Sequence, residues 1–165
     1  TMIPKSLFAA QAAPGEPYIT GLDVNIIRLA DVYLMAAECE IEAGSLANAL
    51  KLVNAVRTRA ASLAPKKTES GVNAAKYNVK PYPSFPDKNY ALKAVRFERR
   101  LELAMEGHRF FDLVRWGIAK STLESYSAFE GNIIPTYKNL VFNANNEYWP
   151  IPQEELDRNS NLKPN

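Results

Sequence analysis

The sequence predicts an all-α fold with long irregular loops. Apolar residues recur at helical spacing in several segments, and stretches rich in proline or glycine separate those segments. Proline lacks the amide donor that a helix interior needs, so these stretches are expected to be irregular. We expect residues 1–165 to form a single domain, with a helical core at about 25–61 and 87–120 and irregular chain at 62–86 and 121–165.

The first predicted helix runs from Asn25 to Gly44, with Asp23 or Asn25 as the residue that caps its start. We expect Gly44 to end this helix by adopting a left-handed conformation. Cys39 is the only cysteine of the chain, so it cannot form an internal disulfide, and we expect it to be a small buried residue. The apolar stripe of the helix comprises Ile26, Ala30, Tyr33, Ala37 and Ile41.

A second helix is predicted at about Leu46 to Ala61, and the short turn between the two helices requires them to pack antiparallel. Small residues such as Ala36 and Ala49 let the two backbones approach closely. This spacing is typical of a tetratricopeptide-like helix pair. The stripe of the second helix comprises Leu46, Ala49, Leu50, Val53 and Val56.

A third helix is predicted from Asp87, its cap, to Glu106. Gly107 should bend or break it, and a shorter helix should follow from His108 to Lys120. The segment YWPIP at residues 148–152 should be extended. The main apolar stripe of the third helix comprises Ala94, Phe97, Leu101, Ala104 and Met105, with Leu92 and Leu103 on the opposite side.

Glu98, Glu102 and Glu106 repeat at a spacing of four and therefore share one side of the third helix. They could form a metal site or an acid/base pair, but the only histidine, His108, follows the glycine and leaves the ligand set incomplete. Ion pairing with nearby arginines is the alternative that we favour, so we expect no catalytic residue and no metal. The expected pairs are Arg99 with Glu102, Glu106 with Arg109, and Asp112 with Arg115, and Arg57 and Arg59 could reach across from the second helix.

Composition excludes several classes of function. The net charge is only +2 and the basic residues are mixed with acids, so we expect no nucleic-acid partner. The glycines form no phosphate-binding loop and no G-x-S-x-G motif exists, which predicts no nucleotide cofactor and no serine-hydrolase triad. Aromatic residues in the loops at 77–90 and 126–149 could stack on sugar rings, and Tyr77 and Tyr82 are the candidate glycan-binding residues.

Four segments carry a resemblance to a known family, in the order and spacing expected of it. They are IIRLADVYLMAAECEIEAG from residue 26, ALKLVNAVRTRA from residue 49, ERRLELAMEGHRFFDLVRWG from residue 98, and YWPIPQEEL from residue 148. Together they resemble the C-terminal part of the SusD/RagB family of outer-membrane lipoproteins. The residues that match include Arg28, Asp31, Asn54, Arg57, Glu98, Arg99, Gly107 and Trp116.

The resemblance implies a fragment of a SusD-like fold and a non-enzymatic protein that binds oligosaccharide. Such a protein sits at the cell surface as an outer-membrane lipoprotein and passes nutrient glycan to a SusC-like TonB-dependent transporter. Neither a signal peptide nor a lipidated cysteine is present, so the membrane would be reached only through a lipid anchor upstream of Thr1. No glycan-binding residue can be carried over, because the family's sugar contacts lie outside these motifs.

Two alternatives come from other classes of function. The first is a tetratricopeptide-like scaffold for protein–protein interaction without its own sugar site. The second is an α-helical hydrolase that uses Glu98 and Glu102, because residues four apart on a helix are about 6 Å apart at Cβ, close to the separation of a retaining glycosidase pair. Burial of these carboxylates would count against the hydrolase.

Overall fold

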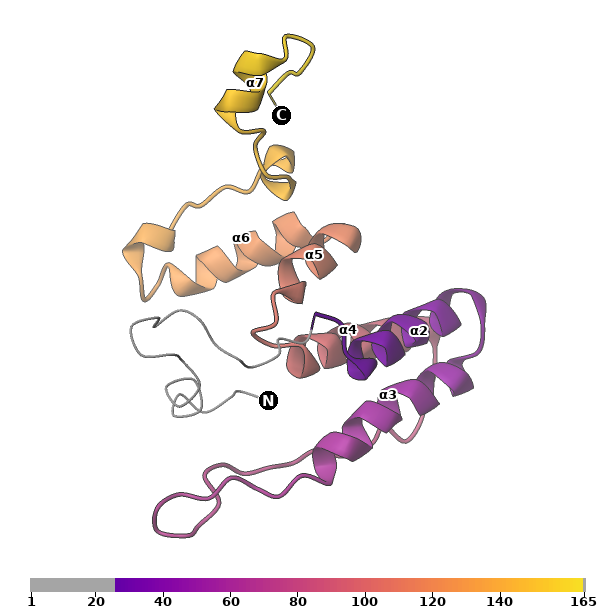
Figure 1. Ribbon diagram of the computed structural model, residues 1–165. Coiled ribbons are helices and arrows are strands. Elements are labelled where there is room, and N and C mark those ends of the chain that lie inside the picture. Colours follow the sequence, from indigo (N-terminus) through magenta and orange to yellow (C-terminus); the bar gives the residue numbers. More distant parts are fainter. Residues whose placement is uncertain (1–25, 165) are drawn as a thin grey trace, which may run out of the picture. The chain divides into compact units, whose positions relative to one another are not determined.

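The computed structural model describes residues 26–164, and within that range the chain forms six α-helices and two short 3₁₀ helices (Figure 1). The prediction of an all-α fold is confirmed. The chain divides into two compact units, one that extends to Glu98 and one that begins at Arg99, and the single domain stays a prediction. The elements are α2 (Leu29–Ala43), α3 (Leu46–Ala61), α4 (Lys88–Glu102), α5 (His108–Arg115), α6 (Ala119–Glu130), η1 (Pro135–Tyr137), η2 (Ala144–Glu147) and α7 (Gln153–Arg158).

Helices α2 and α3 pack along each other and form the predicted helix pair (Figure 1). Ser45 caps the start of α3, and its side-chain oxygen accepts a hydrogen bond from the amide of Ala47 at 3.2 Å. Both helices turn small and β-branched residues inward, so their backbones lie close. The residues buried between them and their neighbours include Ala30, Leu34, Ala37, Ile41, Ala49, Val53 and Val56.

Gly44 ends α2 for a different reason from the one expected. Its φ of −126° is not left-handed, so that prediction is wrong. A Cβ at this position would lie 2.2 Å from Oε2 of Glu40. This carboxylate accepts hydrogen bonds from the amide of Ser45 and from Nδ2 of Asn48, at 3.0 and 3.3 Å. The glycine therefore makes room for a side chain that ties the two helices together.

The start of α2 also differs from the prediction. The helix begins at Leu29 after Arg28, which makes no side-chain cap, while Asp23 and Asn25 lie outside the described residues. Ile26 precedes the helix and is 83% exposed. Cys39 is exposed, contrary to expectation, because it is two residues from the buried Ala37 and therefore about 200° around the helix.

Helix α4 begins as predicted but buries a different face. Oδ1 of Asp87 accepts a hydrogen bond from the amide of Tyr90 at 2.8 Å, which confirms the cap. The predicted main stripe is wrong beyond Ala94, since Phe97 is 51% exposed, Leu101 is 53% exposed, and Ala104 and Met105 are also exposed. The helix instead turns Ala91, Ala94, Val95 and Glu98 inward.

The glycine between α4 and α5 breaks the helix as predicted, with a φ of +83°. Helix α4 already ends at Glu102, short of the predicted Glu106, and Met105 also has a positive φ, of 68°. Helix α5 ends at Arg115, before the predicted end at Lys120, and Gly117 has a left-handed φ of 66°.

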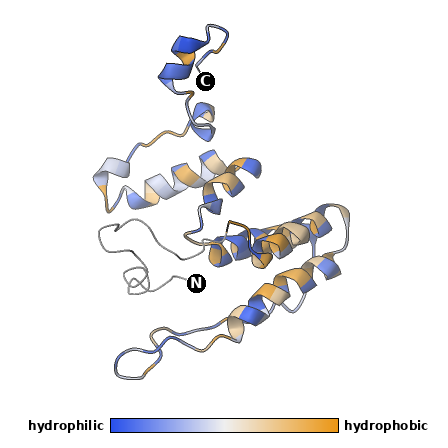
Figure 2. Ribbon diagram, viewed as in Figure 1, coloured by the Kyte–Doolittle hydropathy of each residue, from blue (hydrophilic) through white to orange (hydrophobic). Residues whose placement is uncertain are grey.

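The prediction of irregular chain throughout 121–165 is wrong for Gln153–Arg158, which form α7, and for its first ten residues, which belong to α6. This stretch contains no proline or glycine before Gly131, but its apolar spacing is weak and its buried positions include Ser127. The rest is as expected, with short 3₁₀ turns and an extended YWPIP segment. Helix α7 follows, is largely hydrophilic (Figure 2), and buries none of its residues.

The connection at 62–86 is irregular, as expected, and carries a small turn in which Lys67 and Asn73 form an isolated bridge. Its return to the core is held by Asn54 on α3. Nδ2 of Asn54 donates to the carbonyl of Tyr82 at 2.9 Å, and the amide of Tyr82 donates to Oδ1 of Asn54 at 2.8 Å. Phe85 then packs into the core and is only 8% exposed. In residues 26–164, no helix is both long enough and apolar enough to span a bilayer.

Candidate functional site

The first carboxylate of the predicted series, Glu98, is buried and paired with an arginine. Nη1 of Arg57 lies 2.6 Å from Oε2 of Glu98, and the Glu98 side chain is only 4% exposed. Nε of Arg57 donates to the carbonyl of Lys80 at 2.6 Å. The expectation that Arg57 reaches across from the second helix is confirmed, and the carboxylate serves as a structural partner.

A second buried ion pair spans the glycine break and joins α4 to α5. Nε of Arg99 donates to Oδ2 of Asp112 at 2.8 Å, and the two side chains are 3% and 6% exposed. Nε of Arg115 donates to Oδ1 of the same carboxylate at 2.9 Å, which confirms the predicted pair of Asp112 and Arg115. The bond to Arg99 was missed, because the left-handed Gly107 changes which residues of the two helices face each other. The pair of Arg99 with Glu102 stays a prediction. The predicted pair of Glu106 with Arg109 is wrong, because Arg109 forms no ion pair within residues 26–164.

These carboxylates do not present an open catalytic pair. Glu98 is enclosed against Arg57, whereas an acid/base pair for glycoside hydrolysis must reach the substrate from both sides of the bond. Glu102 is half-buried. In the part of the chain that the structure describes, no group of three or more histidine, cysteine, aspartate or glutamate side chains is placed to hold a metal ion.

The two candidate tyrosines lie in different surroundings. Tyr77 is 49% exposed on the loop. Tyr82 is half-buried, with the guanidinium of Arg57 4.6 Å above its ring and the ring of Phe85 5.7 Å away. Burial raises the pKa of Tyr82, the positive charge of Arg57 opposes this, and Glu98 and Tyr90 raise the pKa further. Tyr82 thus anchors the loop, while Tyr77 is the more accessible of the two.

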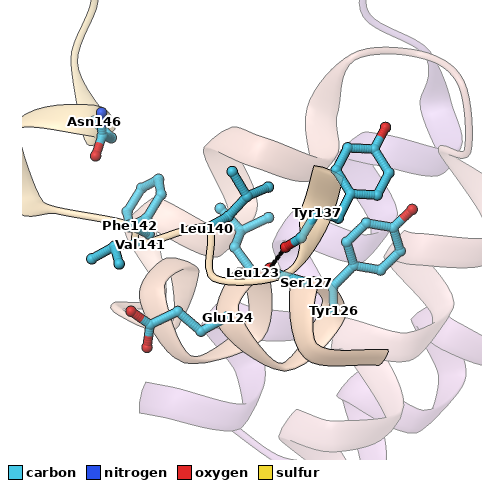
Figure 3. A pocket seen from close by; sticks show the side chains of 9 residues that line it. All are labelled: Leu123, Glu124, Tyr126, Ser127, Tyr137, Leu140, Val141, Phe142 and Asn146. Carbon is cyan, nitrogen blue, oxygen red and sulfur yellow. Dashed lines mark hydrogen bonds between the residues drawn. The ribbon is translucent and has the colours of Figure 1, made fainter. Parts of the chain in front are cut away.

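A hollow of about 430 Å³, which we call the α6 hollow, lies between α6 and the chain at 137–146 (Figure 3). Tyr126 and Tyr137 stand at one end of it and Val141 and Phe142 at the other. Tyr126 is 55% exposed and Tyr137 is 39% exposed, so both rings are accessible. The residues that line the hollow are Leu123, Glu124, Tyr126, Ser127, Tyr137, Leu140, Val141, Phe142 and Asn146.

Hydrogen bonds at both ends of α6 hold the walls of this hollow. The hydroxyl of Ser127 donates to the carbonyl of Tyr137. Nζ of Lys120 donates to the carbonyl of Phe142 at 2.9 Å and to Oε1 of Glu124 at 2.7 Å. Because the segment is tied to the helix at two points, the hollow is preformed and a ligand would not have to order it.

The lining of the α6 hollow combines apolar surface with a few polar groups. The rings of Tyr126 and Tyr137 and the aliphatic residues supply the apolar part, and Glu124 and Asn146 supply carboxylate and amide groups. A pyranose ring has the same division, with apolar C–H faces and hydroxyls at its edge. The sequence indicated aromatic residues at 126–149 but did not single out these two, because it revealed neither α6, which carries Tyr126, nor η1, which carries Tyr137.

Comparison with known proteins identifies the family of the chain. The model of the SusD family matches residues 2–165. The chain belongs to the SusD family. A crystal structure of a SusD superfamily protein from Bacteroides vulgatus superposes with a TM-score of 0.62 and 31% identity, covering 84% of this chain and 26% of that one.

Two curated relatives are SusD-like proteins from Formosa agariphila. SusD-like protein P25 is 36% identical over 138 residues, which cover 81% of this chain and 22% of the relative. SusD-like protein P2 is 34% identical over 146 residues, which cover 84% of this chain and 24% of the relative. The chain therefore spans about a quarter of the length of the SusD-family proteins it matches.

Proposed function

We propose that this SusD-family chain is part of a non-enzymatic protein that binds oligosaccharide at the cell surface and passes it to a SusC-like TonB-dependent transporter. The observation that carries the proposal is the family match, which extends over residues 2–165. The enclosed state of Glu98 supports a binding role over glycoside hydrolysis. An outer-membrane location, with a lipid anchor upstream of this segment, belongs to the same proposal.

Within this chain, the α6 hollow is the site that we propose for a sugar ring. Tyr126 and Tyr137 offer exposed aromatic surface beside polar groups, and the walls are held in place by hydrogen bonds from Ser127 and Lys120. Tyr77 is a second candidate contact, because its side chain is half-exposed on a loop. Tyr82 stays in the proposal as a neighbour that positions this loop, since Arg57 covers one face of its ring.

The test is calorimetric titration of the chain with neutral oligosaccharides chosen from a glycan array. Tyr126→Ala and Tyr137→Ala should each weaken binding about tenfold, the equivalent of about 1.4 kcal/mol. Tyr148→Ala is the matched control, because Tyr148 is 67% exposed but does not line the hollow. Tyr77→Ala in the same series measures the contribution of the loop.

Equal affinity in Tyr126→Ala, Tyr137→Ala and wild type would remove the α6 hollow from the proposal. If Tyr77→Ala alone weakened binding, the sugar site would lie on the loop. Absence of binding to any glycan, by this chain and by a longer protein that contains it, would overturn the proposal of glycan capture.

A scaffold for protein–protein interaction is the second candidate function, and the exposed side of α2 favours it. Leu29 is 63% exposed, Val32 is 43% exposed and Met35 is 41% exposed, and their spacing places them along one side of the helix. Val32→Asp and Met35→Asp should reduce co-purification with a SusC-like transporter if this side contacts it, with the exposed Glu42→Gln on the same helix as control. Unchanged co-purification would count against an interface on α2.

A further inference from the structure

A second hollow lies beside the break between α4 and α5, and its polar lining is mostly basic. Its volume is about 210 Å³. Arg99, Arg100, His108, Arg109 and Asp112 provide the polar groups, and three apolar residues complete the lining. We call it the arginine hollow. It is separate from the α6 hollow, with which it shares no lining residue.

The single carboxylate in this lining is already engaged. Asp112 accepts hydrogen bonds from Arg99 at 2.8 Å and from Arg115 at 2.9 Å, so each of its two oxygens already has a guanidinium partner. Arg100 and Arg109 form no ion pair within residues 26–164. The hollow therefore carries an excess of positive charge.

The position of Arg109 makes this excess of positive charge unfavourable for the folded chain. Its guanidinium lies 5.9 Å from the centre of the Trp116 ring and is half-buried. Burial lowers the pKa of Arg109, and the positive charge of Arg100 lowers it further, whereas Asp112 opposes both effects. Arginine stays protonated at neutral pH, so the folded chain bears the repulsion between the two guanidinium groups until an anion offsets it.

The backbone at the start of α5 adds to the positive electrostatic potential of the arginine hollow. Helix α5 begins at His108, and its N-cap, Gly107, supplies no side-chain cap for the first amides. The N-terminus of a helix carries a partial positive charge of about half a unit and favours a nearby anion. The basic side chains and this helix end therefore act in the same direction.

We propose that the arginine hollow binds an oxyanion group, the sulfate or carboxylate of a small ligand, between Arg100 and Arg109. Planar guanidinium groups bind such oxygens through paired N–H donors. The group could arrive as a free ion or as the acidic substituent of a saccharide, and the same chemistry recognises both. The site does not depend on the α6 hollow, whose lining contains one charged side chain, the acidic Glu124.

The experiment is a titration of the chain followed by amide chemical shifts in NMR spectra. The probes are sodium sulfate, sodium glucuronate and neutral galactose, with sodium chloride adjusted to keep the ionic strength constant. We expect saturable shifts at Leu103, His108 and Arg109 with sulfate or glucuronate and none there with galactose. Tighter binding of glucuronate would identify an acidic saccharide as the source of the group, and tighter binding of sulfate a free ion.

Arg100→Gln and Arg109→Gln should each weaken oxyanion binding about tenfold, because each removes a charged donor. Arg100 is exposed, so its replacement should leave the fold intact even if Arg109→Gln does not fold. Arg158→Gln on α7 is the matched control, since it removes an exposed cation outside the hollow. Absence of saturable shifts, or equal affinity in Arg100→Gln and Arg158→Gln, would overturn the proposal.

Discussion

Arg57 and Glu98 form a buried ion pair that joins α3 to α4. Nη1 of Arg57 lies 2.6 Å from Oε2 of Glu98, and the two side chains are 14% and 4% exposed. The same guanidinium also holds the carbonyl of Lys80 and covers the ring of Tyr82. One arginine therefore links two helices and the long loop between them, which makes it central to the first prediction.

Glu98→Ala should destabilise the chain by about 3 kcal/mol, because it leaves the largely buried Arg57 without its carboxylate. Urea unfolding measures the effect. Glu154→Ala is the control, since the Glu154 side chain is 82% exposed and pairs with Arg158 only at 3.7 Å, so it should change stability by no more than about 0.5 kcal/mol. Equal losses in the two variants would contradict the structural role of Glu98.

Asp112→Asn should also cost about 3 kcal/mol, because the side chain of Arg99 is only 3% exposed and would lose the Asp112 carboxylate. Amide hydrogen exchange should show the largest loss of protection in α5. Asp157→Asn, on the exposed α7, should leave exchange unchanged. Adding Arg99→Met to Asp112→Asn should recover part of the loss, and no recovery would show that the ion pair is not the cause.

Tyr82 should make stability fall at alkaline pH. Its pKa is raised in the folded state by burial above the ordinary 10.0, so the unfolded chain releases this proton first. Its contribution is fully present below pH 10 and is lost as the pH rises through the folded pKa. Tyr82→Phe should flatten the fall of the unfolding free energy above pH 10, whereas the exposed Tyr148→Phe should not. Identical pH profiles would refute the coupling.

Gly131→Ala should disturb the α6 hollow. An added Cβ would lie 2.9 Å from Cα of Lys138 and 2.9 Å from the carbonyl oxygen of Ser127, and both are backbone atoms that cannot rotate away. We expect a loss of about 1–3 kcal/mol from overpacking, together with weaker oligosaccharide binding. Ser125→Ala, on an exposed position of the same helix, is the control for calorimetry and thermal unfolding. Full retention of stability would show that the wall of the hollow can move.

Several elements could be predicted from the sequence because local rules control them. The bounds of α3 at Leu46 and Ala61, the cap at Asp87 and the break at Gly107 follow from short-range spacing, side-chain caps and backbone freedom. The family resemblance also came from sequence, and the family match confirmed it. Helix α6 was missed because the polar residues of STLESYSAFE give little apolar periodicity.

The sequence by itself determined the helical class, the α2–α3 pair and the family. Only the tertiary structure decided which side of α4 is buried. Arg57 donates to the carbonyl of Lys80 and to the carboxylate of Glu98, and these partners are 23 and 41 positions away in the sequence. It also decided that Asp112 pairs with Arg99, and that Tyr126 and Tyr137 border one hollow. Short-range patterns report which residues share a face of one helix, whereas burial and pairing depend on what other segments of the chain bring against that face.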